Sequence, residues 1–339
     1  MGAVAETSND LAALVQGLFF RPHLAALLQS SAAAGLEMIV LKGAALAETL
    51  YPRPGLRPFG DIDVLVHQGD APRTRTLLER LGYIVAPAAW DALMQGADTQ
   101  ANFFKHTERG VVVVELHTDL LSNGFFRGHV QLDADGLWSR ARPAHLADTD
   151  ALILGPEDQL LHLCLHLAGH YCFAPQSLRD IDLLCRCTPM DWPLFTRLAE
   201  EAHTAPLSFA ALSAAATVVE TPVPAAVLSA LTPKHGAARL ARIAAARASD
   251  TSPNGAATER LRFPLLWGLL GTARARRSAL RRTLLPDLRW LVAHYYHGLY
   301  NDPNAPRPRS FADRARLYSR LYAAHLLFLA RRAAGGNGS

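Results

Sequence analysis

The sequence predicts an α+β protein in which a small mixed β-sheet domain is followed by an all-helical part. Up to about residue 150, short apolar runs of strand length alternate with helical patterns bounded by glycine and proline. From Pro156 onward the pattern is helical, and proline with two acids begins the first helix well. The 339 residues, half of them hydrophobic, are enough for two domains with cores of their own.

We expect four segments along the chain. Residues 1–34 are an N-terminal helical segment and 35–150 an α/β domain. Residues 151–300 are a helical domain, and 301–339 hold a proline-rich linker, a basic helix and a flexible tail.

Within these segments, the periodicity of apolar residues and the positions of glycine and proline predict the individual helices and strands. In the α/β domain we expect strands at 37–41, 61–66 and 83–85, helices at 44–50 and 72–81, and a hairpin of 103–106 with 111–117. Residues 118–155 are expected to be irregular, with Asp133, Asp135 and Trp138 in a short loop or strand. Further helices are expected from Pro156, and at 177–184, 191–203, 206–219, 235–249, 258–300 (broken at Pro286) and 311–333, with loops at 252–257 and 301–308.

Composition narrows the compartment and the partners. The four cysteines form neither a disulfide framework nor a paired metal spacing, and no signal peptide or membrane span is evident, so we expect a cytoplasmic protein. From Arg260 onward the chain carries fifteen arginines, no lysine and three aspartates. This region is expected to contact RNA or an anionic membrane surface, or to form solvated helix faces.

Two aspartates in the strand at 61–66 are the first candidate site. Residues two apart in a strand face the same side, so Asp61 and Asp63 lie together while Ile62, Val64 and Val66 face a core. Adjacent carboxylates repel each other unless a cation lies between them, and hard divalent cations prefer oxygen ligands. The pair is therefore a candidate Mg²⁺ site, with two solvent-facing acids at a strand end as the alternative.

A third carboxylate ends the apolar strand 111–117. Burying Glu115 there is costly without a partner, and His117, two residues on, faces the same side.

The string Lys42-Gly43, Tyr51-Pro52, Arg57 and Gly60-Asp61-Ile62-Asp63 resembles the bacterial uncharacterised nucleotidyltransferase family, of the DNA polymerase β-like superfamily. The resemblance implies a polymerase β-like nucleotidyltransferase domain. It also implies two Mg²⁺ ions (or Mn²⁺) held by Asp61, Asp63 and Glu115 as catalytic carboxylates.

The same resemblance implies a triphosphate site at the glycine turn. Its nucleotide-binding candidates are Lys42, Gly43, Arg57, Gly60, Arg179 and Asp180. Arg57 is expected to pair with Asp61 or to hold a phosphate. Arg179 and Asp180 are expected to contact the base or ribose, or to form a structural ion pair. Ala44 stands where the superfamily usually has serine, so Lys42 is expected to take a larger share of the phosphate contact.

Three histidines, His162, His166 and His170, recur at helical spacing on one face. They are expected to pack with one nitrogen satisfied, or to bind a metal or an acidic substrate.

Together these features predict a Mg²⁺-dependent nucleotidyltransferase. It would move NMP from an NTP to an acceptor hydroxyl on a small molecule, a peptide or protein, or an RNA such as tRNA, with release of pyrophosphate. The alternative is a binding or accessory protein on a catalytically degenerate transferase fold, which Ala44 favours.

Overall fold

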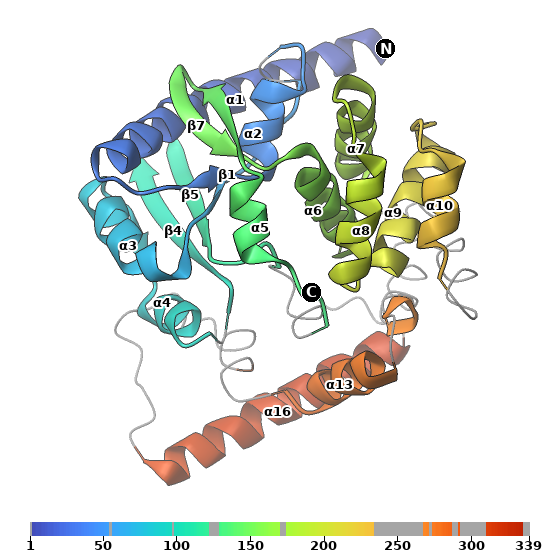
Figure 1. The fold of residues 1–339 in the computed structure, drawn as a ribbon. Helices are drawn as coiled ribbons and strands as arrows, with labels where there is room; N and C mark the ends of the chain where they lie inside the picture. The colour runs from blue at the N-terminus through green and yellow to red at the C-terminus, as the bar shows by residue number, and fades with distance from the viewer. Residues whose placement is uncertain are drawn as a thin grey trace.

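The computed structural model (Figure 1) describes residues 2–53, 56–96, 98–121, 129–169, 174–233, 267–270, 273–286, 291 and 310–334. The helix expected at 235–249, the loops expected at 252–257 and 301–308, and the terminal tail lie outside these residues, as does most of the helical stretch expected at 258–300.

A seven-stranded mixed sheet forms the N-terminal half, with the strand order β3-β4-β5-β2-β1-β7-β6. The strands are β1 (Ile39–Val40), β2 (Ile62–Leu65), β3 (Ile84–Val85), β4 (Gln100–Thr107), β5 (Gly110–His117), β6 (Arg142–Leu146) and β7 (Thr149–Ile153). The hairpin expected around residues 103–117 is confirmed as β4 and β5.

The centre of the sheet brings β2 beside β5 in parallel register. Asp63 pairs in register with Glu115, and Leu65 with His117. Since side chains alternate between the two faces of a sheet, Asp63, Glu115 and His117 share one face. On the other side of β2, β1 runs antiparallel and is followed directly by α2 (Lys42–Thr49).

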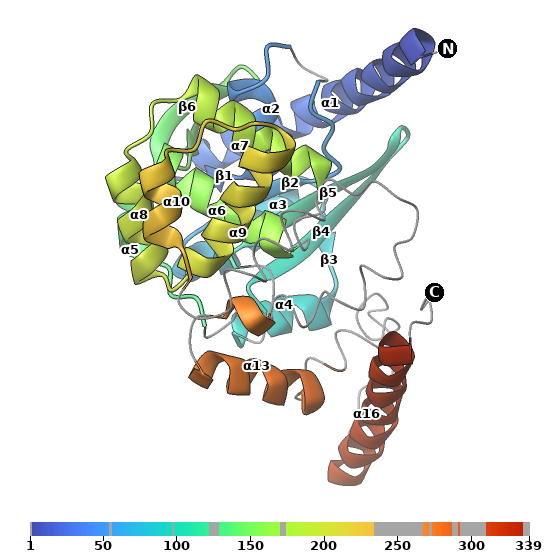
Figure 2. The same ribbon diagram turned by 90° about the vertical axis from the view of Figure 1, so that its right-hand side faces the viewer.

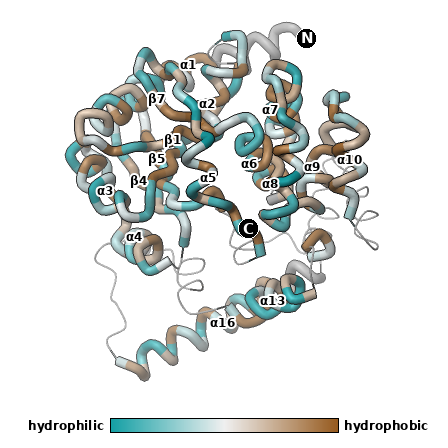
Figure 3. The backbone as a smooth tube through the Cα atoms, viewed as in Figure 1, coloured by the Kyte–Doolittle hydropathy of each residue, from teal (hydrophilic) through white to brown (hydrophobic). Residues whose placement is uncertain are grey.

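Helices cover the opposite face of the sheet. α1 (Gly2–Ala33) lies across it (Figure 1), and its Phe20, Leu24 and Leu27 belong to one buried cluster with Ile62 and Val64. Val66 belongs to the same cluster, and α3 (Ala71–Arg80) packs at its side. The alternation predicted for residues 61–66 is therefore confirmed, and it leaves Asp63 on the other face. In Figure 3, brown segments of the tube mark the hydrophobic residues of the central strands β1 and β5.

The helical part packs beside the sheet, as both ribbon views show (Figures 1 and 2). Its described helices are α6 (Pro156–Gly169), α7 (Pro175–Cys187), α8 (Trp192–Glu201), α9 (Ala205–Val218) and α10 (Ala225–Leu231). α6 packs against α7, α8 and α9, and its leucines join Phe195 and Leu212 in a second large core. The helix start predicted at Pro156 is confirmed.

The expectation for residues 118–155 was wrong. Asp133 caps α5 (Ala134–Ser139), accepting a hydrogen bond from the amide of Gly136, and β6 and β7 then form an edge hairpin. β7 pairs with β1 through Leu152 and Ile153. The two strands are only five residues each, and their exposed and half-buried positions dilute the apolar alternation. α4 (Pro87–Met94) and α10 were also not predicted, since each is only two turns long.

Two basic helices lie apart from both cores (Figures 1 and 2). α13 (Ala273–Leu284) and α16 (Phe311–Ala334) contact each other where Tyr322 donates a hydrogen bond to the Leu284 carbonyl at 2.8 Å. Among the residues that the structure describes, no helix is both long and apolar enough to cross a membrane.

Candidate active site

Asp63 is the centre of a charged cluster on the face of the sheet that α1 does not cover. It is 1% exposed, and it accepts hydrogen bonds from Lys42 Nζ at 2.7 Å and from His117 Nε2 at 2.9 Å, both at Oδ1. Burial by itself would raise the pKa of Asp63. The hydrogen bond from His117 and the charge of Lys42 outweigh burial and hold this pKa well below its ordinary value. Asp63 is therefore a carboxylate at neutral pH.

Glu115 completes the cluster from the neighbouring strand. Its Oε2 lies 3.5 Å from His117 Nε2 and 4.0 Å from Lys42 Nζ. Ligand atoms of Asp63, Glu115 and His117 all lie within 4.8 Å of one another. Two carboxylates and one imidazole from two adjacent strands thus lie close together, because the parallel register places Asp63 opposite Glu115.

Asp61 borders this cluster just before β2. Burial raises the pKa of its carboxyl group to about 6, and the negative charges of Asp63 and Glu115 add to the shift. The carboxylates therefore repel one another despite the nearby Lys42. A divalent cation would relieve that repulsion, and carboxylate oxygens are the ligands that Mg²⁺ prefers. On both charge and donor type, the residues fit a Mg²⁺ site.

Lys42 and His117 supply the cluster's positive side. Burial alone would lower the pKa of Lys42, but the charge of Asp63 outweighs it and leaves that pKa raised. His117 is similar: burial opposes its charge, yet the hydrogen bond with Asp63 raises its pKa. Its Nδ1 is buried and makes no hydrogen bond within the described part of the chain. This arrangement puts the proton on Nε2, where it steadies Asp63. His117 was expected only to share a face with Glu115, and the spacing of two residues was the available signal.

Gly43 is enclosed by protein. A Cβ atom built there would lie 2.5 Å from Phe59 Cβ and 2.9 Å from Arg57 Nη1. Packing against residues 57–59 therefore explains why glycine, which has no side chain, stands at this position. The role of Gly43 toward phosphate stays a prediction. Gly60, by contrast, has nothing within 4 Å of such an atom.

One expectation was that Arg57 pairs with Asp61, and this was wrong. Arg57 forms a forked ion pair with Asp180 of α7, from Nε to Oδ1 at 3.0 Å and from Nη2 to Oδ2 at 2.8 Å. Nor do Arg179 and Asp180 pair with each other. Neighbouring helix residues point in different directions, so Asp180 is buried while exposed Arg179 lies over the Tyr51 ring at 5.6 Å.

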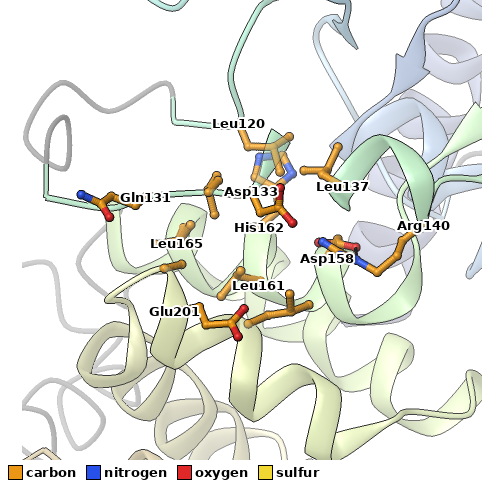
Figure 4. Close-up of a pocket in the computed structure, with 13 residues that line it drawn as sticks. Leu120, Gln131, Asp133, Leu137, Arg140, Asp158, Leu161, His162, Leu165 and Glu201 are labelled. Atoms are coloured by element: carbon orange, nitrogen blue, oxygen red, sulfur yellow. Dashed lines mark hydrogen bonds and ion pairs between the residues drawn. The ribbon is translucent and has the colours of Figure 1, made fainter. Parts of the chain in front are cut away.

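His162 faces the sheet from α6. It is 4% exposed, and burial followed by the charge of Lys42 lowers its pKa well below the ordinary value, so the imidazole is neutral. It lines a cavity of about 30 Å³ between α5, α6 and α8, where Arg140 and Asp158 lie side by side (Figure 4). That volume holds about one water molecule, far too little for a nucleotide. His166 is half-buried one turn later, and His170 lies outside the described residues.

The structure thus combines a mixed sheet that presents carboxylates on adjacent strands with a helical part beside it. The chain belongs to the family described as uncharacterised nucleotidyltransferase, whose sequence model matches residues 8–220. No curated protein matches the chain significantly.

Among solved structures, an antigenic nucleotidyltransferase-like protein from Paracoccidioides brasiliensis is similar, with 16% sequence identity and a TM-score of 0.35. The match covers 62% of this chain and 92% of that protein. This likeness is loose, so family membership rests on the sequence match.

Proposed function

We propose that this protein is a Mg²⁺-dependent nucleotidyltransferase that moves NMP from an NTP to an acceptor hydroxyl and releases pyrophosphate. The observation that carries the proposal is the register pairing of Asp63 with Glu115, with the charge of Asp61 beside them. Membership of the family supports the same class of reaction. The acceptor is a small molecule, a peptide or protein, or an RNA.

Asp61, Asp63 and Glu115 would hold the metal. When bound, Mg²⁺ would neutralise phosphate charge and activate the acceptor hydroxyl. The protein's own contribution is to keep these oxygens in place and ionised. Lys42 and His117 keep Asp63 in place and ionised through their hydrogen bonds to it. The pairing of β2 with β5 fixes the spacing between Asp63 and Glu115.

Of the two candidate cations Lys42 and Arg57, Lys42 is the better placed to meet a phosphate. Its side chain is 13% exposed and its Nζ lies at the cluster, whereas Arg57 and Asp180 are committed to each other. Since an ammonium is a point charge, it can contact a phosphate without the geometry that a guanidinium needs. With Ala44 in place of a hydroxyl donor, Lys42 carries most of this contact.

Transfer of label tests the proposal. The protein is incubated with each α-labelled NTP, with Mg²⁺, Mn²⁺ or EDTA, and with small alcohols, sugars, tRNA or the protein alone as acceptor. Intact mass then identifies the modified molecule. We expect metal-dependent transfer that the double variant Asp61→Asn/Asp63→Asn lowers by about 10²-fold or more, because the ligands that would hold Mg²⁺ against the phosphate are lost.

The matched control is Asp150→Asn, which removes an exposed strand carboxylate from β7 and should leave transfer unchanged. Full activity in the Asp61/Asp63 double variant would refute the assignment of these carboxylates.

A second candidate is a nucleotide-binding or accessory protein without transfer activity. The ion pair of Lys42 with Asp63, together with Ala44, favours it, since an internal cation already neutralises one carboxylate. Titration of NTP by calorimetry separates the two functions. The enzyme requires nucleotide affinity that increases with Mg²⁺, whereas the accessory protein would show the same affinity, or none, with and without the metal.

A further inference from the structure

A buried polar network ties the helical part to the segment that follows α2. Asp180 of α7 accepts both arms of the Arg57 guanidinium, and its Oδ1 also accepts hydrogen bonds from Tyr51 Oη at 2.7 Å and from Gln176 Nε2 at 3.1 Å. Gln176 in turn donates to Tyr51 Oη at 2.7 Å. Asp180 is 1% exposed and Arg57 9% exposed. Such a network is rigid because breaking one partner leaves a buried charge unpaired.

The network reaches the active site through Gly43. Arg57 Nη1 and the Phe59 side chain lie so close to the Gly43 backbone that there is no room for a Cβ atom. The segment carrying Arg57 therefore lies directly on the first turn of α2.

Lys42, the residue before Gly43, has a backbone that needs such support. Its φ of +41° falls in the left-handed region, which costs a non-glycine residue free energy. Such a conformation persists only where the surroundings fix it. On one side the Leu41 amide donates to the Asp63 carbonyl at 2.9 Å, and on the other side Gly43 lies under Phe59.

We propose that Asp180 is a positioning residue, acting through Arg57 on the Lys42–Gly43 turn so that the Lys42 ammonium stays against Asp63. Arg57 and Asp180 then serve the site without touching the nucleotide. The consequence for transfer rests on the proposed function, whereas the placement of Lys42 does not. The α7 helix thereby becomes part of the active-site architecture of the sheet.

The test measures how readily Lys42 reacts with an amine-acylating reagent. The chain has three lysines, Lys42, Lys105 and Lys234, so peptide mass spectrometry follows Lys42 directly with Lys105 as internal reference. In Asp180→Asn we expect Lys42 to be acylated about tenfold faster than in wild type, the equivalent of one lost hydrogen bond to a charged group. Arg57→Lys keeps the charge and loses the fork, so it should change the rate in the same direction.

Asp158→Asn is the matched control. Asp158 is also buried and also accepts a forked pair, from Arg140 at 2.7 and 2.9 Å, but this pair makes no contact with the Lys42–Gly43 turn. Its Lys42 rate should equal that of wild type. Tyr51→Phe removes a single hydrogen bond to Asp180 and should give a Lys42 rate between those of wild type and Asp180→Asn. If Asp180→Asn does not fold, the rates in Tyr51→Phe and Arg57→Lys test the positioning role instead.

An unchanged Lys42 rate in Asp180→Asn and Arg57→Lys, or an equal acceleration in Asp158→Asn, would overturn the proposal. The affinity for Mg²⁺ and ATP is measured on the same proteins. If wild type binds no nucleotide, the proposed function fails, yet the acylation rates still test the positioning role.

Discussion

Replacing Gly43 by alanine tests the packing against the Lys42–Gly43 turn. The added Cβ atom would meet Phe59 Cβ at 2.5 Å, Arg57 Nη1 at 2.9 Å and Phe59 Cγ at 3.1 Å. A Cβ contact at 2.5 Å is shorter than van der Waals contact allows, and Phe59 Cβ cannot move away by a rotamer change. Either the segment at residues 57–59 or the start of α2 has to shift.

The magnitude follows from two opposed effects. Overpacking of this kind costs about 1–3 kcal/mol. Glycine to alanine in a helix interior gains about 1 kcal/mol, and less in the first turn, where Gly43 lies. We therefore expect Gly43→Ala to lower the free energy of unfolding by about 1–2 kcal/mol.

Equilibrium urea unfolding followed by circular dichroism measures this loss. Gly69→Ala is the control, since Gly69 has nothing within 4 Å of a built Cβ and no positive φ. It should leave stability unchanged or raise it by up to about 1 kcal/mol. If Gly43→Ala were as stable as wild type, residues 57–59 would not be packed on this turn, and the route from Asp180 to Lys42 would lose its middle link.

Two further predictions concern the helices. Asp133→Ala removes the side-chain cap of α5 and should lower the free energy of unfolding by about 0.5–1 kcal/mol in the same urea assay. The control is Asp135→Ala in the first turn of α5, which should lower it less because Asp135 makes no such hydrogen bond. Burial raises the pKa of the Cys185 thiol to about 12, so at pH 8 a thiol reagent should modify exposed Cys187 first; faster labelling of Cys185, read by peptide mass, would contradict the packing of α7.

Where the sequence predicted the fold correctly, the signal was local. Alternation in residues 61–66 placed Ile62, Val64 and Val66 in the core and Asp63 on the other face, because a strand has a period of two whatever its neighbours are. The start of α6 at Pro156 is equally local, since proline and acids suit the first turn of any helix. The edge hairpin β6–β7 was missed because its half-exposed strands lack such a period.

The candidate site divides in the same way. The residues Asp61, Asp63 and Glu115 follow from the sequence and its resemblance to the family, and the register of β2 with β5 brings Asp63 and Glu115 together. Their roles as metal ligands remain a prediction. The identity of each partner did not follow from sequence. Arg57 was expected to pair with Asp61, four positions away, or to hold a phosphate, and it pairs with Asp180 at a separation of 123 residues.

The sequence by itself thus determined the strands and helices that carry a clear local period or start signal, the apolar face of β2, and the carboxylates that are candidates for chemistry. Only the tertiary structure decided that Lys42 and His117 hold Asp63, and that Asp180 of α7 pairs with Arg57, which lies against the Lys42–Gly43 turn. The physical reason is that periodicity and capping depend on neighbours along the chain. Ion pairs and buried hydrogen bonds depend instead on which distant groups the packing of the two cores brings within about 3 Å of each other.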